Sequence, residues 1–383
     1  MKSVNRLHAR LSIICSSGNS IILGLSFTSF NILESISKFT YVENSFITYS
    51  TLSSLAVSSI FLGGLLFNIF NKMKNEKILI LFSTFTMLVG YLLMYVYPSV
   101  YLILVSRIII GLGCGCACFV VPQYIYTLAS EENKGLWCSI HPINMNLGIL
   151  LGQSLIKFNT VESWMTPYRI INIVLCFLLL SQIFILDTDK GTEESVSIRE
   201  LINNEHSLKS IIVVCLMHIS QHLSGIDYIS IYLPEILNND YLLVLGIYFL
   251  TVPSVIISSI LLNKYGRKYL YMISVLLLGI SSVVLIKYKV YGLIVFLIGY
   301  NIGVSNVPWV LPNECTPERY VPPITNLGII CNWGSAYILL TVLSQFHKIF
   351  GDVIFLLYSI SMLGMLIFTY VYVPETKGNT EFI

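Results

Sequence analysis

A group of polar side chains interrupts one apolar stretch of this 383-residue chain: Gln221, His222, Ser224 and Asp227 lie within seven consecutive positions. Polar side chains inside an apolar span are costly, and they usually face a cavity or a neighbouring helix. A Gln amide donates and accepts hydrogen bonds at once, and an Asp carboxylate can bind a ligand or exchange a proton. The chemistry on offer is therefore hydrogen bonding to a polar ligand, or proton coupling.

Asp227 is the least expected member of this group, because a carboxylate near the middle of a membrane is unfavourable. The alternative to a ligand or coupling group is a protonated carboxylic acid that mimics Asn. His222 is near enough in sequence to be its partner. However, a spacing of five residues does not place two side chains on one face of a helix.

Amides and indoles in other apolar stretches form a second set of candidates: Asn146, Asn301, Trp309, Asn332 and Trp333. A lone tryptophan in a membrane is most often an interfacial anchor. Trp309 and Trp333 are instead flanked by Pro308 and Asn332, so we expect both indoles to line a cavity.

The composition places most of the chain in lipid. It is 55% hydrophobic and only 11% charged, with a mean hydropathy of +0.79, whereas soluble proteins carry about 25% charged residues. This excludes a soluble enzyme, a nucleic-acid binder and a disordered regulator. The net charge of +2 is too small to indicate a polyanionic partner.

A membrane-spanning helix needs about 20 mostly apolar residues, and the hydrophobic runs predict twelve of them. The predicted spans are 11–33, 47–70, 78–98, 100–127, 136–157, 167–187, 209–233, 240–262, 268–287, 290–312, 323–345 and 350–373. We expect Asn306, Pro308 and Pro312 to interrupt the tenth span, because broken helices near a transport site free backbone groups and provide hinges.

The distribution of basic residues predicts the orientation. Fifteen Lys and Arg lie on the side that holds both termini, and seven lie near helix ends on the other side. Because cytosolic loops carry the excess of positive charge, both termini are predicted to be cytosolic.

Metal and enzyme chemistry find no support in the sequence. The nine cysteines form no Cys-x-x-Cys and no His/Cys cluster at metal-ligand spacing, so we interpret them as small packing residues and expect no cofactor. The motifs His-Glu-x-x-His and Gly-x-Ser-x-Gly are also absent, which argues against an intramembrane enzyme.

One long polar stretch divides the predicted spans into six and six. We predict an N-terminal bundle over 1–187, a short cytosolic linker over 188–207, and a C-terminal bundle with a short tail over 208–383. Loops at equivalent places in the two halves begin alike, at Asn71-Lys72 and Asn263-Lys264. This layout is typical of transporters built from two rigid bundles around a midplane site.

Several short motifs, in this order and on these spans, resemble the sugar-porter branch of the major facilitator superfamily. They are Ser106-Arg107 with Gly111, Gly113 and Gly115; Val121-Pro122-Gln123-Tyr124-Ile125; Gln221-His222-Leu223-Ser224-Gly225-Ile226-Asp227; Pro308-Trp309 with Glu314; Asn332-Trp333; and Val373-Pro374-Glu375-Thr376-Lys377-Gly378. The resemblance, closest to insect trehalose-transporter-like proteins and also to animal glucose transporters, extends over nearly the whole chain. It implies the all-α major facilitator fold of twelve transmembrane helices in two six-helix bundles.

The resemblance also implies which side chains bind a sugar. Trp309 and Asn332 match positions that contact sugar in the family, and Gln221, Trp333 and Asn146 complete the predicted site. The chain departs from the family pattern at three other predicted contacts: His222 replaces a usual Gln, Asp227 a usual Asn, and Asn301 a usual acidic residue.

In the family, basic loops pair with Glu at helix ends and hold the outward-facing state. The matching residues here define the predicted cytosolic latch: Gly266, Arg267, Lys268, Glu314 and Glu375. In the first half, both the basic loop and its Glu partner are missing. Lys74-Asn75-Glu76 stands in place of the basic loop, and Thr127 stands in place of the Glu. Our hypothesis is a weakened inward gate; a degenerate copy that transports poorly is the alternative.

Arg107 joins the predicted gating residues. Proton-coupled sugar porters pair this Arg with an Asp in the first helix, and here the first span has no carboxylate before Glu34. We therefore predict facilitative transport of a hexose or a disaccharide such as trehalose across the plasma membrane, with two bundles rocking about one site. A proton-coupled symporter, kept open by Asp227, and a non-transporting sugar sensor are the alternatives.

Overall fold

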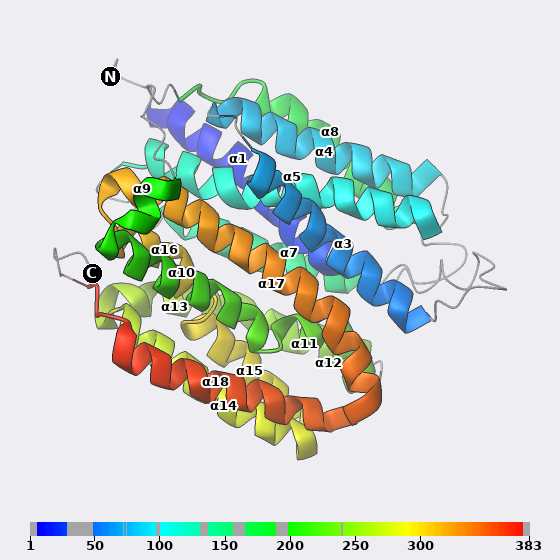
Figure 1. The fold of residues 1–383 in the computed structure, drawn as a ribbon. Coiled ribbons are helices and arrows are strands. Elements are labelled where there is room, and N and C mark those ends of the chain that lie inside the picture. Colours follow the sequence, from blue (N-terminus) through cyan, green and yellow to red (C-terminus); the bar gives the residue numbers. More distant parts are fainter. Residues whose placement is uncertain are drawn as a thin grey trace. The chain divides into compact units, whose positions relative to one another are not determined.

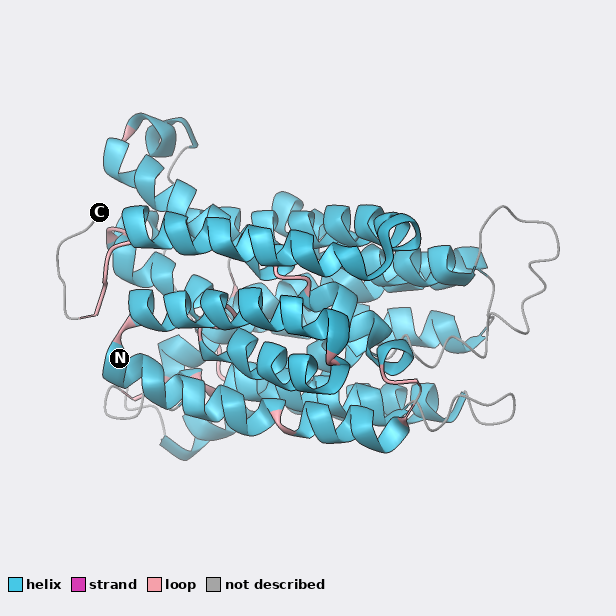
Figure 2. Cartoon of the chain, turned by 90° about the horizontal axis from the view of Figure 1, so that it is seen from below, coloured by secondary structure: helices cyan, strands magenta, loops and turns pink. Residues whose placement is uncertain are grey.

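The computed structural model describes residues 6–28, 49–71, 73, 75–96, 100–130, 137–155, 165–188, 198–238 and 240–377. Within these ranges the ordered elements are helices, and no strand occurs (Figures 1 and 2). The chain forms two compact units, Met1–Thr192 and Glu193–Ile383. The boundary between them lies inside the stretch 188–207 that the sequence predicts as a linker.

The first unit contains helices that coincide with the first six predicted spans. They are α1 (Arg6–Thr28), α3 (Tyr49–Phe70), α4 (Glu76–Val96), α5 (Val100–Leu128), α7 (Ile140–Ser154) and α8 (Met165–Gln182). Helix α5 packs on α1, α3 and α4, and α1 packs on α7. Glycines permit the close approach, because a Cβ at Gly111 would lie 2.1 Å from the Ile60 carbonyl oxygen.

Buried amides tie α1, α4 and α8 of this unit together. The side chains of Asn19, Thr84 and Gln182 have no exposed surface. The Gln182 Nε2 donates to Asn19 Oδ1 at 2.8 Å, and the Thr84 hydroxyl contacts Gln182 Oε1 at 2.5 Å. Because hydrocarbon offers these groups no partner, they must bond to one another, and this bonding specifies how the three helices pack.

The second unit is assembled from more and shorter helices. It contains α9 (Ile198–Asn203), α10 (Glu205–Leu223), α11 (Ile226–Ile236), α12 (Tyr241–Phe249), α13 (Thr251–Tyr265), α14 (Arg267–Lys287), α15 (Lys289–Ile302), α16 (Val307–Cys315), α17 (Val321–Phe350) and α18 (Ile354–Tyr372), with 3₁₀ turns at Glu318–Tyr320 and Gly351–Val353. Each of the last six predicted spans coincides with a helix or a helix pair. Three of these spans are broken into two helices: α10–α11, α12–α13 and α15–α16.

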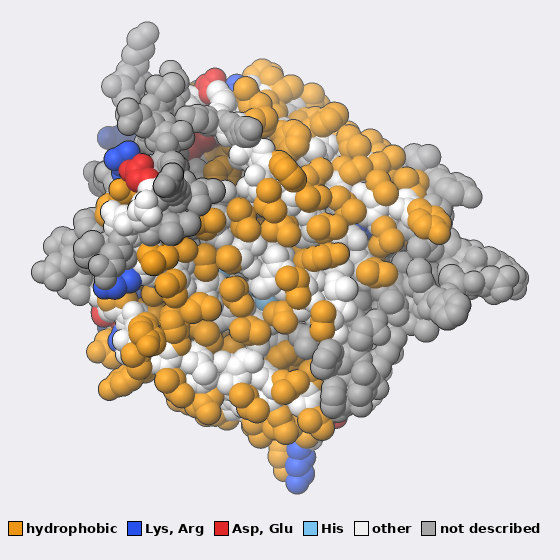
Figure 3. Space-filling view, viewed as in Figure 1, with side chains coloured by type: hydrophobic (Ala, Val, Ile, Leu, Met, Phe, Trp, Pro, Cys, Tyr) orange, Lys and Arg blue, Asp and Glu red, His pale blue; other side chains and the backbone are white. Residues whose placement is uncertain are grey.

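The exposed surface of the described helices is largely apolar, as a lipid-facing protein requires (Figure 3). On α8, for example, the exposed side chains Ile170, Ile173, Val174 and Phe177 recur with helical periodicity. Nine helical segments among the described residues are long and apolar enough to cross a membrane, and Leu55–Phe70 is a shorter apolar helix. All nine cysteines are free thiols.

Gly225 makes the α10–α11 break possible, and this predicts an effect on stability. Its φ of +89° is a left-handed conformation, and an added Cβ would lie 2.5 Å from the Tyr358 ring. We expect Gly225→Ala to lower the thermal unfolding temperature in detergent by several degrees, since left-handed backbone alone costs about 1–2 kcal/mol for an L-residue. Gly364→Ala is the matched control, because nothing lies within 4 Å of its Cβ. Equal unfolding temperatures for the two variants would contradict this account.

Candidate functional site

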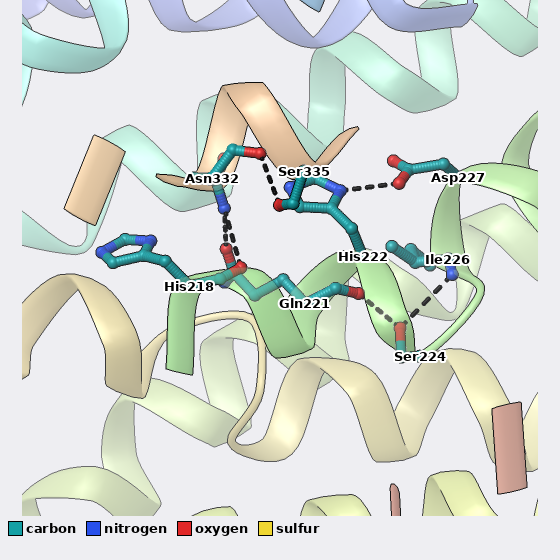
Figure 4. Close-up of polar contacts among 8 residues, drawn as sticks. All are labelled: His218, Gln221, His222, Ser224, Ile226, Asp227, Asn332 and Ser335. Atoms are coloured by element: carbon teal, nitrogen blue, oxygen red, sulfur yellow. Dashed lines mark hydrogen bonds and ion pairs between the residues drawn. The ribbon is translucent and has the colours of Figure 1, made fainter. Parts of the chain in front are cut away.

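The break between α10 and α11 brings His222 and Asp227 together. Leu223 ends α10, Gly225 turns the chain, and Asp227 lies in the first turn of α11. The His222 Nδ1 and Asp227 Oδ2 are 2.6 Å apart (Figure 4). A continuous helix would place these side chains on different faces, so the pairing depends on the turn at Gly225.

Ser224 closes this turn with two hydrogen bonds. Its hydroxyl donates to the Gln221 carbonyl oxygen at 2.5 Å and accepts from the Ile226 N–H at 3.3 Å. A helix end leaves backbone donors and acceptors without helical partners, and a buried serine can satisfy one of each. Ser224 is therefore a structural element of the break, while its neighbours His222 and Asp227 carry the ionisable groups.

Gln221 connects α10 to two other elements. Its Nε2 donates to the carbonyl oxygens of Val304 and Ser305, at 2.8 and 3.1 Å. Its Oε1 accepts from Asn332 Nδ2 on α17 at 2.5 Å, and the same Nδ2 lies 3.3 Å from the His218 carbonyl oxygen. The amides of two predicted sugar contacts thus share one hydrogen-bond network, which also reaches the break between α15 and α16.

His222 follows Gln221 directly on α10, so the His222–Asp227 pair adjoins the same network. Asp227, His222, Asn332 and Gln221 thus form a polar cluster on α10, α11 and α17 (Figure 4). His222, Asn332 and Gln221 are buried, whereas the Asp227 side chain keeps 15% of its surface exposed. The cluster lies wholly within the second unit.

At the α15–α16 break, Asn301 bonds to α13, and its role as a sugar contact stays a prediction. The Asn301 Nδ2 donates to Ser254 Oγ on α13 at 2.9 Å, and Asn306 Nδ2 donates to Ser258 Oγ at the same distance. On the other side of the break, Ser274 Oγ accepts from the Val304 N–H at 2.9 Å. Serine side chains of α13 and α14 therefore form hydrogen bonds with the polar groups at the break. The interruption predicted at Asn306 and Pro308 is present, and α16 begins at Val307; the interruption predicted at Pro312 is wrong, because Pro312 lies inside α16.

The two predicted cavity tryptophans differ in exposure. Trp333 is only 2% exposed, whereas Trp309 is half-buried at the start of α16. Trp309 meets the ring of His218 edge to face, with centroids 4.8 Å apart and an interplanar angle of 89°. His218 was not predicted as a site residue. The only signal for it was a polar side chain three positions before Gln221, on the same face of the helix.

In the first unit, Asn146 donates to the Pro142 carbonyl oxygen of its own helix at 3.0 Å and is buried. Other polar groups of α7 bond to α1. The Ser20 Oγ and His141 Nδ1 are 2.8 Å apart, and Asn144 Nδ2 donates to Ser17 Oγ at 3.1 Å. The role of Asn146 as a sugar contact stays a prediction.

The five residues of the predicted cytosolic latch lie together in the second unit. Glu375 accepts from the backbone N–H groups of Arg267 and Lys268, at 2.9 and 3.2 Å, and so caps the start of α14. Arg267 Nη2 pairs with Glu314 Oε1 at 2.5 Å. Gly266 has a φ of +91°, and a Cβ there would lie 2.5 Å from the Glu375 carboxylate. This contact explains why a glycine stands before the basic pair.

The equivalent place in the first unit is held by other groups. The Thr188 hydroxyl donates to Glu76 Oε2 at 2.5 Å, and Asn75 Nδ2 donates to Asp187 Oδ1 at 3.0 Å. From α5, the Tyr124 hydroxyl donates to the Leu186 carbonyl oxygen at 2.7 Å. The segment after α8 is thus bonded to the start of α4 and to α5. Comparison of the two halves in sequence did not predict these bonds.

Arg107 takes part in neither of these two networks. It is fully buried on α5, where Nη1 donates to the Ser26 carbonyl oxygen at 3.1 Å and Nε to that of Ala56 at 3.4 Å. The Ser26 hydroxyl is 2.8 Å from the Tyr91 hydroxyl. The α1 residue that meets Arg107 is therefore a serine, and α1 itself contains no acidic residue.

An all-helical membrane protein of two units, with polar clusters at broken helices, has the architecture of a membrane transporter. The E. coli xylose transporter in an inward-open conformation matches the structure with a TM-score of 0.79 at 17% identity, covering 96% of this chain and 97% of that one. A D-xylose–proton symporter matches at 0.81 and 17%, covering 97% and 99%. These likenesses confirm the predicted major facilitator fold.

The chain belongs to the family described as "Sugar (and other) transporter", which matches residues 17–188 and 183–382. The facilitated glucose transporter member 2 of Gallus gallus is 23% identical over 343 residues, covering 74% of this chain and 64% of the relative. That of Sus scrofa is 24% identical, covering 85% and 75%. The sugar transporter ERD6-like 16 of Arabidopsis thaliana is 25% identical, covering 76% and 72%. The predicted family is thereby confirmed.

The bonds around Thr188 predict how the first unit responds to mutation. We expect Thr188→Val to speed hydrogen–deuterium exchange in the segment 183–188, because it removes the hydroxyl that binds Glu76 and leaves a buried carboxylate with one partner fewer. Thr127→Val is the control, since the Thr127 hydroxyl bonds only to the Gln123 carbonyl of its own helix. Exchange that is unchanged in Thr188→Val would show that this bond does not hold the segment.

Proposed function

We propose that this chain carries a sugar, either a hexose or a disaccharide such as trehalose, across the plasma membrane by facilitated diffusion with alternating access. Family membership and the fold support sugar transport. The proposal for the site rests on the polar cluster of the second unit, in which Asn332 bonds to Gln221 and to the carbonyl oxygen of His218, whose ring packs against Trp309. The surplus of basic residues on the side of the termini supports cytosolic termini.

The polar cluster offers the groups that a sugar needs. Sugar hydroxyls donate and accept hydrogen bonds, and amides such as Gln221 and Asn332 do both. The apolar C–H face of a sugar stacks on an indole, and Trp309 keeps part of its surface exposed. Trp333 is buried beside Asn332, so we assign to it packing within the site rather than direct contact with sugar.

The surroundings of Arg107 favour facilitated diffusion. Proton coupling through this residue would use an acidic partner on α1, but α1 contains no acidic residue, and the guanidinium donates to the carbonyl oxygens of Ser26 and Ala56. These groups do not change charge across the physiological pH range. Because the described helix α1 offers Arg107 no carboxylate, the proposal is that sugar moves down its own gradient.

We expect the protein to support uptake of radiolabelled sugar in a transporter-null cell, with no loss of uptake after addition of a protonophore. Asn332→Ala and Trp309→Ala should each raise KM roughly 2- to 10-fold, as the loss of one hydrogen bond or ring contact implies. Leu363→Ala, on the exposed face of α18, is the control. No uptake of any hexose or disaccharide by protein confirmed at the cell surface would contradict the proposal.

Proton-coupled transport is the second candidate, and the His222–Asp227 pair is the observation that favours it. His222 is buried and Asp227 is partly exposed, the two are in contact at 2.6 Å, and they are placed where the family has two neutral amides. Tyr300 of α15 and Tyr358 of α18 face Asp227, and His218 lies near His222 on α10. A proton gained or lost at this pair would change the charge within the proposed sugar site.

A double-substitution experiment distinguishes the two candidates. For a facilitator, His222→Gln with Asp227→Asn should keep most uptake, because neutral amides replace the pair together. His222→Gln alone should transport less, since it leaves the partly buried Asp227 carboxylate without its partner. The measurement is uptake at several values of external pH. A wild type that concentrates sugar with an inward proton gradient, and a double variant that does not, would establish coupling instead.

A further inference from the structure

We propose that His218 is a positioning residue that holds the Trp309 indole in place within the sugar site. The proposal rests on the proposed function, since Trp309 is there assigned to stack on the sugar. His218 itself has no exposed surface, so it cannot be a direct contact for a ligand in this structure. Trp309 is half-buried, and the indole is therefore the member of the pair that can meet a sugar.

The contact between the two rings is specific in geometry. Their centroids are 4.8 Å apart and their planes are nearly perpendicular, at 89°. Edge-to-face packing is the arrangement that aromatic rings prefer, because the positive edge of one meets the negative face of the other. This contact fixes the tilt of the indole as well as its position, and stacking on a sugar depends on both.

Helix α17 holds His218 from the other side. Gly328 lies against the imidazole, and a Cβ built there would be 2.7 Å from Cδ2 of His218 and 2.8 Å from Cγ1 of Val214. One turn further along α17, Asn332 Nδ2 lies 3.3 Å from the His218 carbonyl oxygen. His218 is thus packed between the backbone of α17 and the indole of α16. Its ring contacts Trp309 and its carbonyl oxygen lies beside the Asn332 amide, and both of these residues are proposed sugar contacts.

This arrangement requires a ring of about the size of imidazole, and it does not require a charge. A smaller side chain would leave space beneath the indole, and a side chain without a ring would lose the edge-to-face contact. A side chain at position 328 would displace the imidazole from the opposite side. The same defect should therefore arise from His218 and from Gly328, although the two residues are on different helices.

The experiment compares His218→Ala, His218→Gln, His218→Phe and Gly328→Ala in sugar uptake. We expect His218→Ala, His218→Gln and Gly328→Ala to raise KM roughly 2- to 10-fold, with the maximal rate close to wild type, as the loss of one aromatic contact implies. His218→Phe should restore most of the wild-type KM, because it keeps the ring. Gly364→Ala, which adds a Cβ in open space, is the control.

A second readout uses the fluorescence of Trp309 in protein whose other three tryptophans are replaced by Phe. His218→Ala should lower its anisotropy, and His218→Phe should not. An unchanged KM and anisotropy in His218→Ala would overturn the inference, as would a His218→Phe protein as defective as His218→Ala. If wild type transports no sugar, the proposed function fails, and the anisotropy still decides whether His218 holds the indole.

Discussion

The structure of this protein depends on one constraint: a polar group placed in hydrocarbon must find its partner within the protein. The α10–α11 and α15–α16 breaks show how the chain meets it. Ser224 satisfies backbone groups at the first break, while Gln221, Ser274 and Asn306 do so at the second. Gln221 both bonds to the second break and is a proposed sugar contact, so the shape of the site and the stability of this break are linked.

The two units satisfy the polar groups at the ends of their helices with different kinds of side chain. In the second unit a charged network, with Arg267, Glu314 and Glu375, joins the start of α14 to the end of α16 and to the tail. In the first unit, Thr188 and Tyr124 hold the corresponding segment with hydroxyl donors. The loss of charged residues in the first half is therefore accompanied by other bonds at the same place, and it does not by itself leave that segment without support.

Hydropathy predicted the positions of the helices because the bilayer sets their length, and the family motifs predicted the grouping of the latch residues. Other features depend on distant packing and could not be predicted. The His222–Asp227 contact requires the left-handed turn at Gly225, which sequence spacing alone does not reveal. The contact between His218 and Trp309 depends on how α16 and α17 approach α10. The burial of Trp333 likewise depends on how neighbouring helices pack around it. The residues that flank it predicted a position on a cavity, and the indole is almost fully buried.

The central claim is that this chain moves sugar across a membrane rather than only binding it. Counterflow in proteoliposomes tests this claim most directly: purified protein is reconstituted into vesicles loaded with unlabelled sugar, and entry of labelled sugar is measured at equal pH on both sides. The account predicts transient accumulation of label that is reduced in Trp309→Ala. Binding of sugar by the purified protein, with no entry of label beyond protein-free vesicles, would contradict it and identify a sugar sensor instead.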